Sequence, residues 1–352
     1  MGCLRHFYSL YLLYGKRPGM GINILHMKRV SILVLEECVL ACIFDTRYMF
    51  TGVNEFLKQV GLDPLFEVQL VGLTKEVALN NGAFTVHTDA LIGDVKNTDL
   101  IFIPALFGDL DIALEANKAF IPWIVQQYEK GAEVASLCIG AFLLASTGLL
   151  NGKQCSTHWL FANEFRERFP DVTLVDGRIV TEEQGLYSSG GASSYWNLLL
   201  HIVEKYTNRE IAIMAAKYFL IEIDRKSQSP FVMFNGQKKH EDEPIKLAQE
   251  FIEENIAEKI SVEELAVKYA IGRRHFERRF KKATNNTPVE YIQRVKIEAA
   301  KKHLERTARN VSEVMYEVGY SDTKAFRTVF KKITGLSPIE YRNKYNREAA
   351  IA

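Results

Sequence analysis

The pattern of apolar and polar positions changes character once along the chain, near residue 223. Before that point, short continuous apolar runs alternate with amphipathic stretches, one of them at 44–60 and a longer one ending at Gly131. VSILVL (30–35) is a continuous apolar run, which predicts a strand buried on both faces of a sheet. Further strands are predicted at FEVQLVGL (66–73) and DLIFIPAL (99–106). Alternation of this kind is typical of an α/β domain with a central, mainly parallel sheet.

A further predicted strand, 133–137, runs directly into Cys138. Gly140 then opens a predicted apolar helix over 140–150. A sharp turn from a strand into a helix is where a reactive side chain can be held up beside backbone N–H groups. At this stage three interpretations of Cys138 stay open: a nucleophile, part of a ligand pocket, or a small residue that packs under the turn.

Beyond residue 223 the chain becomes polar and loses its period, and it then turns helical throughout. The stretch DRKSQSPFVMFNGQKKHEDEP carries Pro, Gly and a run of charges, which is typical of a linker. The first residues have no such organisation, and Met27 is an alternative start. The sequence therefore predicts a flexible extension (1–27), an α/β domain (28–223), a linker (224–244), an all-α domain (245–345) and a tail (346–352).

The helical part repeats itself. FERRFKKATNNTPVEY (276–291) and FRTVFKKITGLSPIEY (326–341) share eight identities at an offset of fifty positions. Such self-similarity indicates two copies of one supersecondary unit. Each copy predicts a short helix, a tight turn and a second helix: 261–270 and 275–283 in the first, 311–320 and 323–333 in the second, with a long helix at 288–307 between the copies.

The second helix of each copy has one apolar and one polar face. Pairs of Phe four residues apart face inward. An exposed helix with Arg and short polar side chains fits the major groove, and the Lys pairs at the helix ends suit phosphates. Solvated faces of a small helical bundle are the alternative, but two copies favour DNA reading. The predicted DNA-binding residues are Arg273, Arg274, Glu277, Arg278, Lys281, Lys282, Thr323, Lys324, Arg327, Thr328, Lys331 and Lys332.

Charge and cysteine usage narrow the function classes. From Pro244 onward 22 Lys and Arg stand against 15 Asp and Glu, a net charge of +7, whereas the preceding residues carry −6. A basic domain joined to an acidic one suggests a polyanion-binding module with a separate partner domain.

The five Cys are scattered without CxxC pairs, so we expect reduced thiols in the cytoplasm, no metal and no cofactor. No apolar run reaches the roughly 18 residues of a membrane span.

Residues 245–345 resemble the AraC/XylS-type DNA-binding domain, which has two helix-turn-helix units bridged by a linker helix. The motifs ISVEELAVKYAIGRRHFERRFKKAT and VGYSDTKAFRTVFKKITGLSPIEYR carry the resemblance, together with Arg294 on the linker helix. One departure is Gly272, where this family usually has a capping Ser or Asn. A glycine there weakens the N-cap of the first recognition helix by a few tenths of a kcal/mol, about the usual cost of that exchange, and leaves its role intact.

The first domain resembles the PfpI/ThiJ type of the class I glutamine amidotransferase-like fold. SLCIGAFLLASTGLLNGKQCSTHWLFANEF (136–165) and YSSGGASSYWNLLLHIVEKY (187–206) carry this resemblance. Fused ahead of an AraC-type domain, it is similar to the GlxA family of transcription regulators. The resemblance implies a flavodoxin-like sandwich, and it matches Cys138 to the elbow nucleophile and His158 to its partner. Gly190 and Gly191 match the glycine turn before the helix that lines the site.

The departures from catalytic relatives all point away from turnover. Ile139 follows the elbow where the PfpI-type proteases have His, and PALFG replaces a Pro-Gly-Gly turn, with Ala105 and Leu106 in place of the glycines. Cys42 stands where an acidic residue is expected, and Asp45 comes three residues late. We therefore expect a vestigial or ligand-pocket site at Cys138, His158, Gly190 and Gly191, with no catalytic residue.

These observations predict a DNA-binding transcription regulator whose first domain senses a small, nitrogenous metabolite. Its expected partners are double-stranded DNA, a small-molecule effector, a second copy of the chain and RNA polymerase, with no membrane. The alternative is a Cys-dependent hydrolase or glyoxalase-like enzyme fused to a DNA-binding domain. A third hypothesis is redox sensing through oxidation of Cys138.

Overall fold

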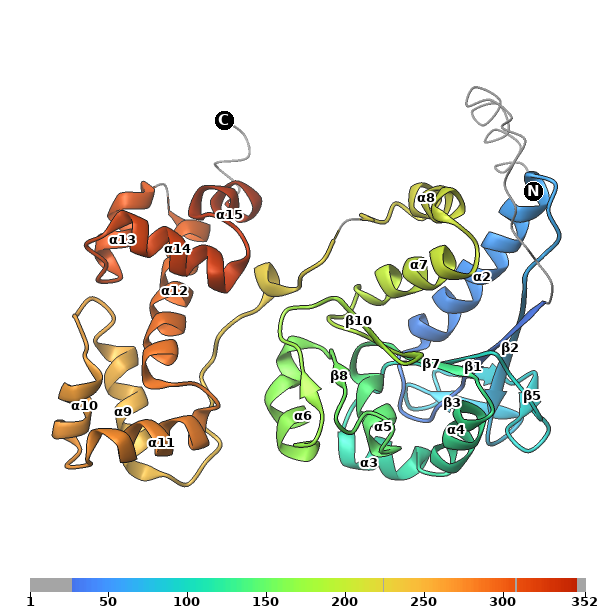
Figure 1. Ribbon diagram of the computed structural model, residues 1–352, viewed down its shortest axis with the longest axis horizontal. Helices are drawn as coiled ribbons and strands as arrows, with labels where there is room; N and C mark the ends of the chain where they lie inside the picture. Colours follow the sequence, from blue (N-terminus) through green and yellow to red (C-terminus); the bar gives the residue numbers. More distant parts are fainter. Residues whose placement is uncertain (1–26, 224, 308, 347–352) are drawn as a thin grey trace. The chain divides into compact units, whose positions relative to one another are not determined.

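The computed structural model describes residues 27–223, 225–307 and 309–346, and the chain forms two compact units (Figure 1). The boundary between them lies between Lys226 and Ser227. This division falls inside the predicted linker at 224–244. The predicted extension (1–27) and the predicted tail (346–352) lie outside the described residues, except for Met27 and Asn346.

The first unit is built on a seven-stranded sheet in which all neighbouring strands are parallel except β10 and β11. Parallel strands of an α/β unit are covered on both faces, which explains why β6 is apolar and buried throughout and why the last four residues of β1 are buried. The strand order across the sheet is β10 (Val180–Glu183), β11 (Leu186–Ser189), β7 (Glu133–Ser136), β6 (Leu100–Ile103), β1 (Lys28–Leu33), β2 (Phe66–Gly72) and β5 (Ala90–Leu91).

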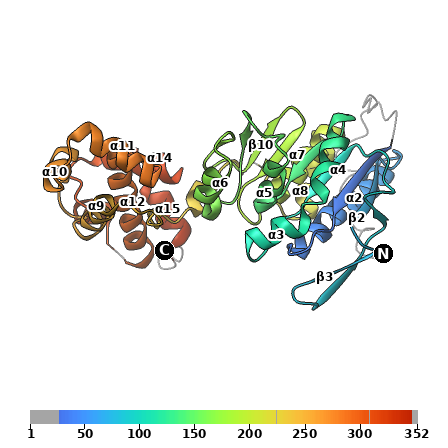
Figure 2. The same cartoon turned by 90° about the horizontal axis from the view of Figure 1, so that it is seen from below.

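Helices cover the sheet on both faces, so the unit has three layers. One face carries α2 (Leu40–Gln59), α7 (Tyr195–Tyr206) and α8 (Arg209–Tyr218), and the other carries α3 (Leu110–Asn117), α4 (Phe120–Glu129) and α5 (Ala141–Ser146) (Figure 1). The hairpin of β3 (Glu76–Leu79) and β4 (Phe84–His87) projects from the unit (Figure 2). The remaining elements of the unit are β8 (Gln154–Cys155), α6 (Ala162–Arg168) and β9 (Thr173–Leu174). The predicted flavodoxin-like sandwich with a mainly parallel sheet is confirmed.

Two predicted elements are shorter than the apolar pattern suggested. The strand predicted over 99–106 ends at Ile103, because Pro104 has no N–H to donate to a neighbouring strand. The helix predicted over 140–150 is α5, which follows a 3₁₀ turn at Cys138–Gly140 and ends before Gly148. Gly148 has φ of +77°, a conformation that glycine adopts at little cost and that stops a helix.

The second unit is all helical, as predicted. Its helices are α9 (Glu243–Glu254), α10 (Val262–Lys268), α11 (Arg273–Thr284), α12 (Pro288–Arg306), α13 (Val311–Glu317), α14 (Thr323–Thr334) and α15 (Pro338–Tyr345). The predicted capping box is present: Ser261 Oγ accepts from Glu264 N, and the Glu264 carboxylate accepts from Ser261 N. Such a box satisfies two donors at the start of α10 and fixes where that helix begins.

Two separate apolar cores hold this unit together. The first contains Phe276 and Phe280 of α11, and the second contains Phe326 and Phe330 of α14. The long helix α12 contributes side chains to both cores, so it joins the two copies of the repeat. Within the described ranges, no helix is long and apolar enough to cross a membrane.

Part of the predicted linker is packed against the second unit. We call residues 229–237 the strap. Lys301 Nζ of α12 donates to Val232 O at 2.6 Å, and Phe234 N donates to the Glu298 carboxylate at 3.1 Å. The hydroxyl of Tyr345 donates to Pro230 O at 3.1 Å. Backbone groups of the strap are therefore bound by side chains of α12 and α15.

Candidate nucleic-acid interface and elbow site

The first candidate recognition helix, α11, is oriented by its apolar side. Phe276 and Phe280 are fully buried, and the Phe280 ring packs edge-on against Tyr291 of α12, with ring centroids 5.3 Å apart. Because helix positions three and four apart share a face, positions two residues before each phenylalanine point away from the core. Arg274 and Arg278 are accordingly exposed.

The second candidate recognition helix, α14, repeats this arrangement fifty residues later. Phe326 and Phe330 are fully buried, and Phe330 packs edge-on against Tyr341 with ring centroids 5.5 Å apart. Asp322 caps the helix, and its carboxylate accepts from Ala325 N. At the start of α11 the equivalent residue is Gly272, which has no side chain and therefore makes no side-chain cap. Both helices nevertheless span twelve residues.

The predicted DNA-binding residues all lie on exposed faces of these two helices, except that Glu277 is half-buried. Arg273 is engaged on its own surface, because its guanidinium contacts Glu277 at 3.2 Å and Glu263 at 3.5 Å. Within the described residues, Arg274, Arg278 and Arg327 have no ion-pair partner. These three guanidinium groups therefore remain available to a polyanion.

Sequence reasoning gave no role to Arg279, which lies in the same basic run. Its guanidinium binds Asp242, the residue that caps α9, at 2.7 and 2.9 Å. This bidentate contact holds the pKa of the Asp242 carboxyl below its usual range. Arg279 therefore stabilises the packing of α11 on α9 and does not belong to the exposed face.

The elbow at Cys138 has the geometry that the sequence predicted. Cys138 has φ of +53°, in the left-handed region that a residue other than glycine rarely adopts. The Cys138 N–H donates to Ser189 Oγ at 3.0 Å, and Thr157 Oγ1 donates to Cys138 O at 3.1 Å. These bonds tie the elbow to the end of β11 and to the segment before His158.

Gly140 is required by close approach of the next loop. A Cβ at this position would lie 2.5 Å from Pro104 O and 2.7 Å from Ile103 O, both backbone atoms. The elbow is thus pressed against the carboxyl end of β6, where ligands of parallel α/β sheets usually bind.

The predicted site residues come to the same end of the sheet without forming a catalytic pair. Gly190 and Gly191 follow β11 and are buried, and Gly190 N donates to Ile179 O at 2.7 Å. The Nδ1 atom of His158 accepts from Leu160 N at 3.1 Å. In the part of the chain that the structure describes, no hydrogen bond joins His158 to Cys138.

The electrostatics of the elbow do not favour a thiolate. The Cys138 side chain is only 6% exposed, and burial raises the pKa of its thiol to about 12, with nearby Cys42 adding to the effect. Burial also lowers the pKa of His158 below its ordinary value. A neutral thiol and a neutral imidazole do not form the ion pair that activates a cysteine nucleophile.

Cys42, which stands where an acidic residue is expected, is part of the apolar core. Cys38 and Cys42 are buried, and burial raises the pKa of each thiol to about 12. Asp45, which lies further along α2, accepts a hydrogen bond from the Tyr195 hydroxyl. Among the described residues, no group of three or more His, Cys, Asp or Glu side chains is placed to hold a metal ion.

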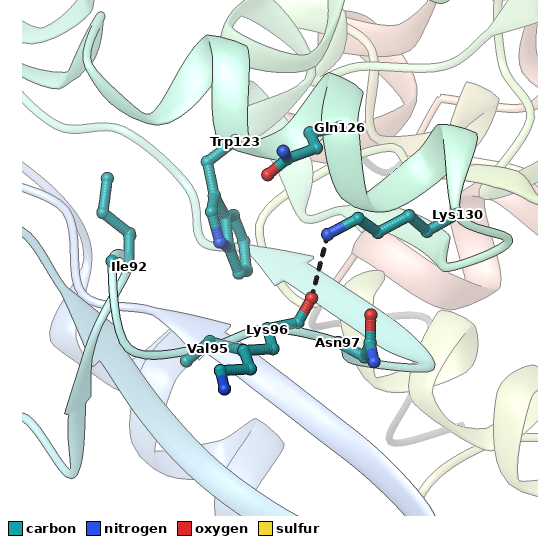
Figure 3. Close-up of a pocket in the computed structure, with 8 residues that line it drawn as sticks. Ile92, Val95, Lys96, Asn97, Trp123, Gln126 and Lys130 are labelled. Atoms are coloured by element: carbon teal, nitrogen blue, oxygen red, sulfur yellow. Dashed lines mark hydrogen bonds between the residues drawn. The ribbon is translucent and has the colours of Figure 1, made fainter.

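A hollow of about 460 Å³ lies elsewhere in the first unit (Figure 3). Trp123 of α4 forms one wall, and Lys130 Nζ donates to Lys96 O across it at 3.1 Å. Part of its lining directly precedes β6 in the chain, and the rest lies on α4 or directly after it, so the hollow is at the amino end of β6. None of the predicted elbow residues lines it.

Because the Cys138 thiol is buried and neutral, we expect it to react slowly with alkylating agents. At neutral pH we expect little modification, and a rate that rises by about tenfold per pH unit from pH 7 to 10, because only the thiolate reacts. Peptide mass spectrometry after iodoacetamide treatment measures this, with Cys138→Ser as the control that identifies the peptide. A rate that levels off below pH 8 would show a low pKa and contradict the prediction.

Comparison with known proteins divides the chain as the structure does. Residues 52–205 match the model of the DJ-1/PfpI family, and residues 265–344 match the model of a helix-turn-helix domain. A solved structure of a Vibrio parahaemolyticus protein assigned as a transcriptional regulator is 23% identical and has a TM-score of 0.50. The match covers 55% of this chain and 99% of that one, and at this identity it concerns the fold alone.

Two curated relatives match well over half of the chain. The HTH-type transcriptional regulator GbdR of Pseudomonas aeruginosa is 26% identical over 246 residues, which is 67% of this chain and 64% of GbdR. The HTH-type transcriptional regulator GlxA of Rhizobium meliloti is 21% identical over 215 residues, which is 61% of this chain and 66% of GlxA. The chain thus matches somewhat less than two thirds of the length of each relative.

Proposed function

Because this chain joins a DJ-1/PfpI domain to an AraC-type helix-turn-helix domain, we propose that it is a sequence-specific DNA-binding transcription regulator. The observation that carries the proposal is the repeated presentation of basic helices. In both copies, buried phenylalanines turn a face of exposed Arg, Lys and Thr side chains outward. Two such helices on one rigid helical unit suit two major-groove segments of one duplex.

Each helix has two kinds of contact to offer. Arg274, Arg278 and Arg327 can donate bidentately to guanine edges, which gives sequence preference. The Lys pairs at the helix ends, Lys281–Lys282 and Lys331–Lys332, can neutralise phosphates, which gives affinity that falls with salt. The net charge of +7 from Pro244 onward supports the same assignment.

Selection from a pool of random duplexes tests the proposal. The full chain should enrich one motif with two half-sites, one for each recognition helix. Recovery of sequences no different from the starting pool would contradict sequence-specific binding.

The first unit is proposed to sense a small, nitrogenous metabolite beside Cys138 and His158. Support comes from the elbow geometry, from the glycine turn after β11, and from the neutral thiol, which suits a pocket floor better than a nucleophile. The same role suits a protein that dimerises through its first unit and that contacts RNA polymerase while it is bound to DNA. The effector acts by binding one conformation of the chain better than another.

A thermal-shift screen of the full chain against nitrogenous metabolites tests the sensing proposal, because a ligand of the native state raises the melting temperature. His158→Ala should reduce the shift, whereas His87→Ala, on the exposed hairpin, should leave it unchanged. A shift that both variants retain in full would place the ligand elsewhere.

A Cys-dependent hydrolase is the second candidate function, and the left-handed backbone of Cys138 is the observation that favours it. Turnover of peptide, amide or α-oxoaldehyde substrates by the wild type, abolished in Cys138→Ser, would establish it. We expect no turnover, because the thiol is neutral and lacks a hydrogen bond to His158 among the described residues.

A further inference from the structure

Lys296 lies at the seam between the two apolar cores of the second unit. Its neighbours on α12 divide between these cores, because Val295 belongs to the first and Ile297 to the second. Lys296 itself is only 6% exposed. Burying an ammonium group costs several kcal/mol unless its donors are satisfied, so the partners of this side chain decide what it does.

Those partners come from both helix-turn-helix units. Lys296 Nζ donates to Glu258 O at 2.9 Å, in the loop before α10, and to Val318 O at 3.1 Å, at the end of α13. The Tyr320 ring lies beside it, with its centroid 5.8 Å from Nζ. One ammonium group therefore joins the loop before α10, in the first copy of the repeat, to the turn after α13, in the second copy.

The backbone at Gly319 lies so close to the loop before α10 that the two segments cannot move closer together. Gly319 has φ of +72°, and a Cβ there would lie 2.4 Å from Ala257 O and 2.5 Å from Lys296 Nζ. The turn after α13, in the second copy of the repeat, thus rests directly on the loop before α10, in the first copy. Movement between the two copies would have to break both hydrogen bonds of Lys296.

The repeat provides an internal comparison. Fifty positions after Lys296 stands Asn346, which is also buried and whose amide donates to Leu304 O at 2.9 Å and Thr307 O at 3.0 Å. Both acceptors of Asn346 belong to the end of α12, where its own copy begins. Each copy thus has a buried donor at this position, but only the longer side chain of Lys296 reaches across to the other copy.

We propose that Lys296 is a positioning residue that holds the two recognition helices, α11 and α14, at one separation and thereby restricts the protein to one spacing of DNA half-sites. The inference rests on the proposed DNA-binding function. When two modules are rigidly joined, the second binding event becomes intramolecular, and the gain of about a hundredfold or more is lost when the geometry forbids both contacts.

Spacing variants of the selected duplex test this directly. Inserting about five base pairs between the half-sites turns one of them by about half a helical turn. We expect the wild type to lose about a hundredfold in affinity on this duplex, whereas Lys296→Met should lose less than about tenfold. Affinity for a duplex with a single half-site should differ by less than about twofold between the two proteins, since no base contact changes.

Two further variants make the result specific. Lys296→Asn copies the residue of the second repeat, which can reach its own copy but not Val318, and should relax the spacing as Lys296→Met does. Lys302→Met removes an exposed lysine of the same helix and should keep the wild-type spacing. Equal spacing losses in wild type, Lys296→Met and Lys296→Asn would overturn the inference. A wild type that selects no motif at all would instead contradict the proposed function.

A measurement without DNA covers the case in which a variant binds poorly. Spin labels introduced by His275→Cys and Ala325→Cys occupy equivalent exposed positions of α11 and α14. Their distance distribution, measured by pulsed electron resonance, should be narrow in the Lys296 protein and broader with Lys296→Met. An unchanged distribution would count against the positioning role.

Discussion

Replacing Arg274 and Arg327 together by Ala should weaken binding to the selected duplex by about 2 kcal/mol or more, or about thirtyfold in Kd. Each guanidinium is exposed, has no ion-pair partner within the described residues, and stands on the outward face of its recognition helix. Removal of a bidentate contact to guanine takes away discrimination as well as affinity. The preference for the selected over a scrambled duplex should therefore fall with the affinity.

Fluorescence anisotropy titrations at fixed salt measure both quantities. The matched control is Lys75→Ala with Lys96→Ala, which removes two exposed positive charges from the first unit and should change Kd little. If the arginine variant loses affinity equally for selected and scrambled duplexes, the arginines act only as charges and the assignment of base reading fails.

Lys301→Met should lower the free energy of unfolding of the second unit by about 3 to 5 kcal/mol. The Lys301 and Glu298 side chains are only 4% and 14% exposed and contact each other at 2.7 Å. Together they bind the strap, through Val232 O and Phe234 N. Substitution of Lys301 alone leaves a largely buried carboxylate without its cation, which is why the loss is large.

Hydrogen exchange of the full chain, followed by mass spectrometry, reads the two units separately. Peptides of α12 and of the strap should lose protection in Lys301→Met, while peptides of the first unit keep theirs. Protection should return in large part when Glu298→Gln is added, because no charge then remains buried. Lys302→Met is the neighbouring exposed control, and a loss of the same size there would contradict the account.

Both domains could be identified from the sequence because their signals are local. The repeat of buried phenylalanines at a spacing of four, together with the Ser261–Glu264 cap, predicts helices and their outward faces without tertiary information. The elbow at Cys138 follows from an apolar strand that meets Gly140. The structure and the comparisons confirm the two-domain resemblance.

The long-range contacts could not be read in the same way. Lys296 and Lys301 look like ordinary surface lysines of a helix, and only the shape of the cores shows that both are buried. The sequence predicts a linker over the strap, since the side chains that bind its backbone groups are more than sixty residues away in sequence. The resemblance to catalytic relatives matches His158 to a partner of Cys138, but in the structure a local turn lets His158 Nδ1 accept from Leu160 N instead.

The most direct test of the central claim is a competition titration of the full chain with its selected duplex against a scrambled duplex of the same length and composition. At physiological salt, a regulator that reads bases from two recognition helices should prefer the selected duplex by about a thousandfold or more. Equal affinity for the two duplexes would contradict the claim that this protein is a sequence-specific DNA-binding regulator.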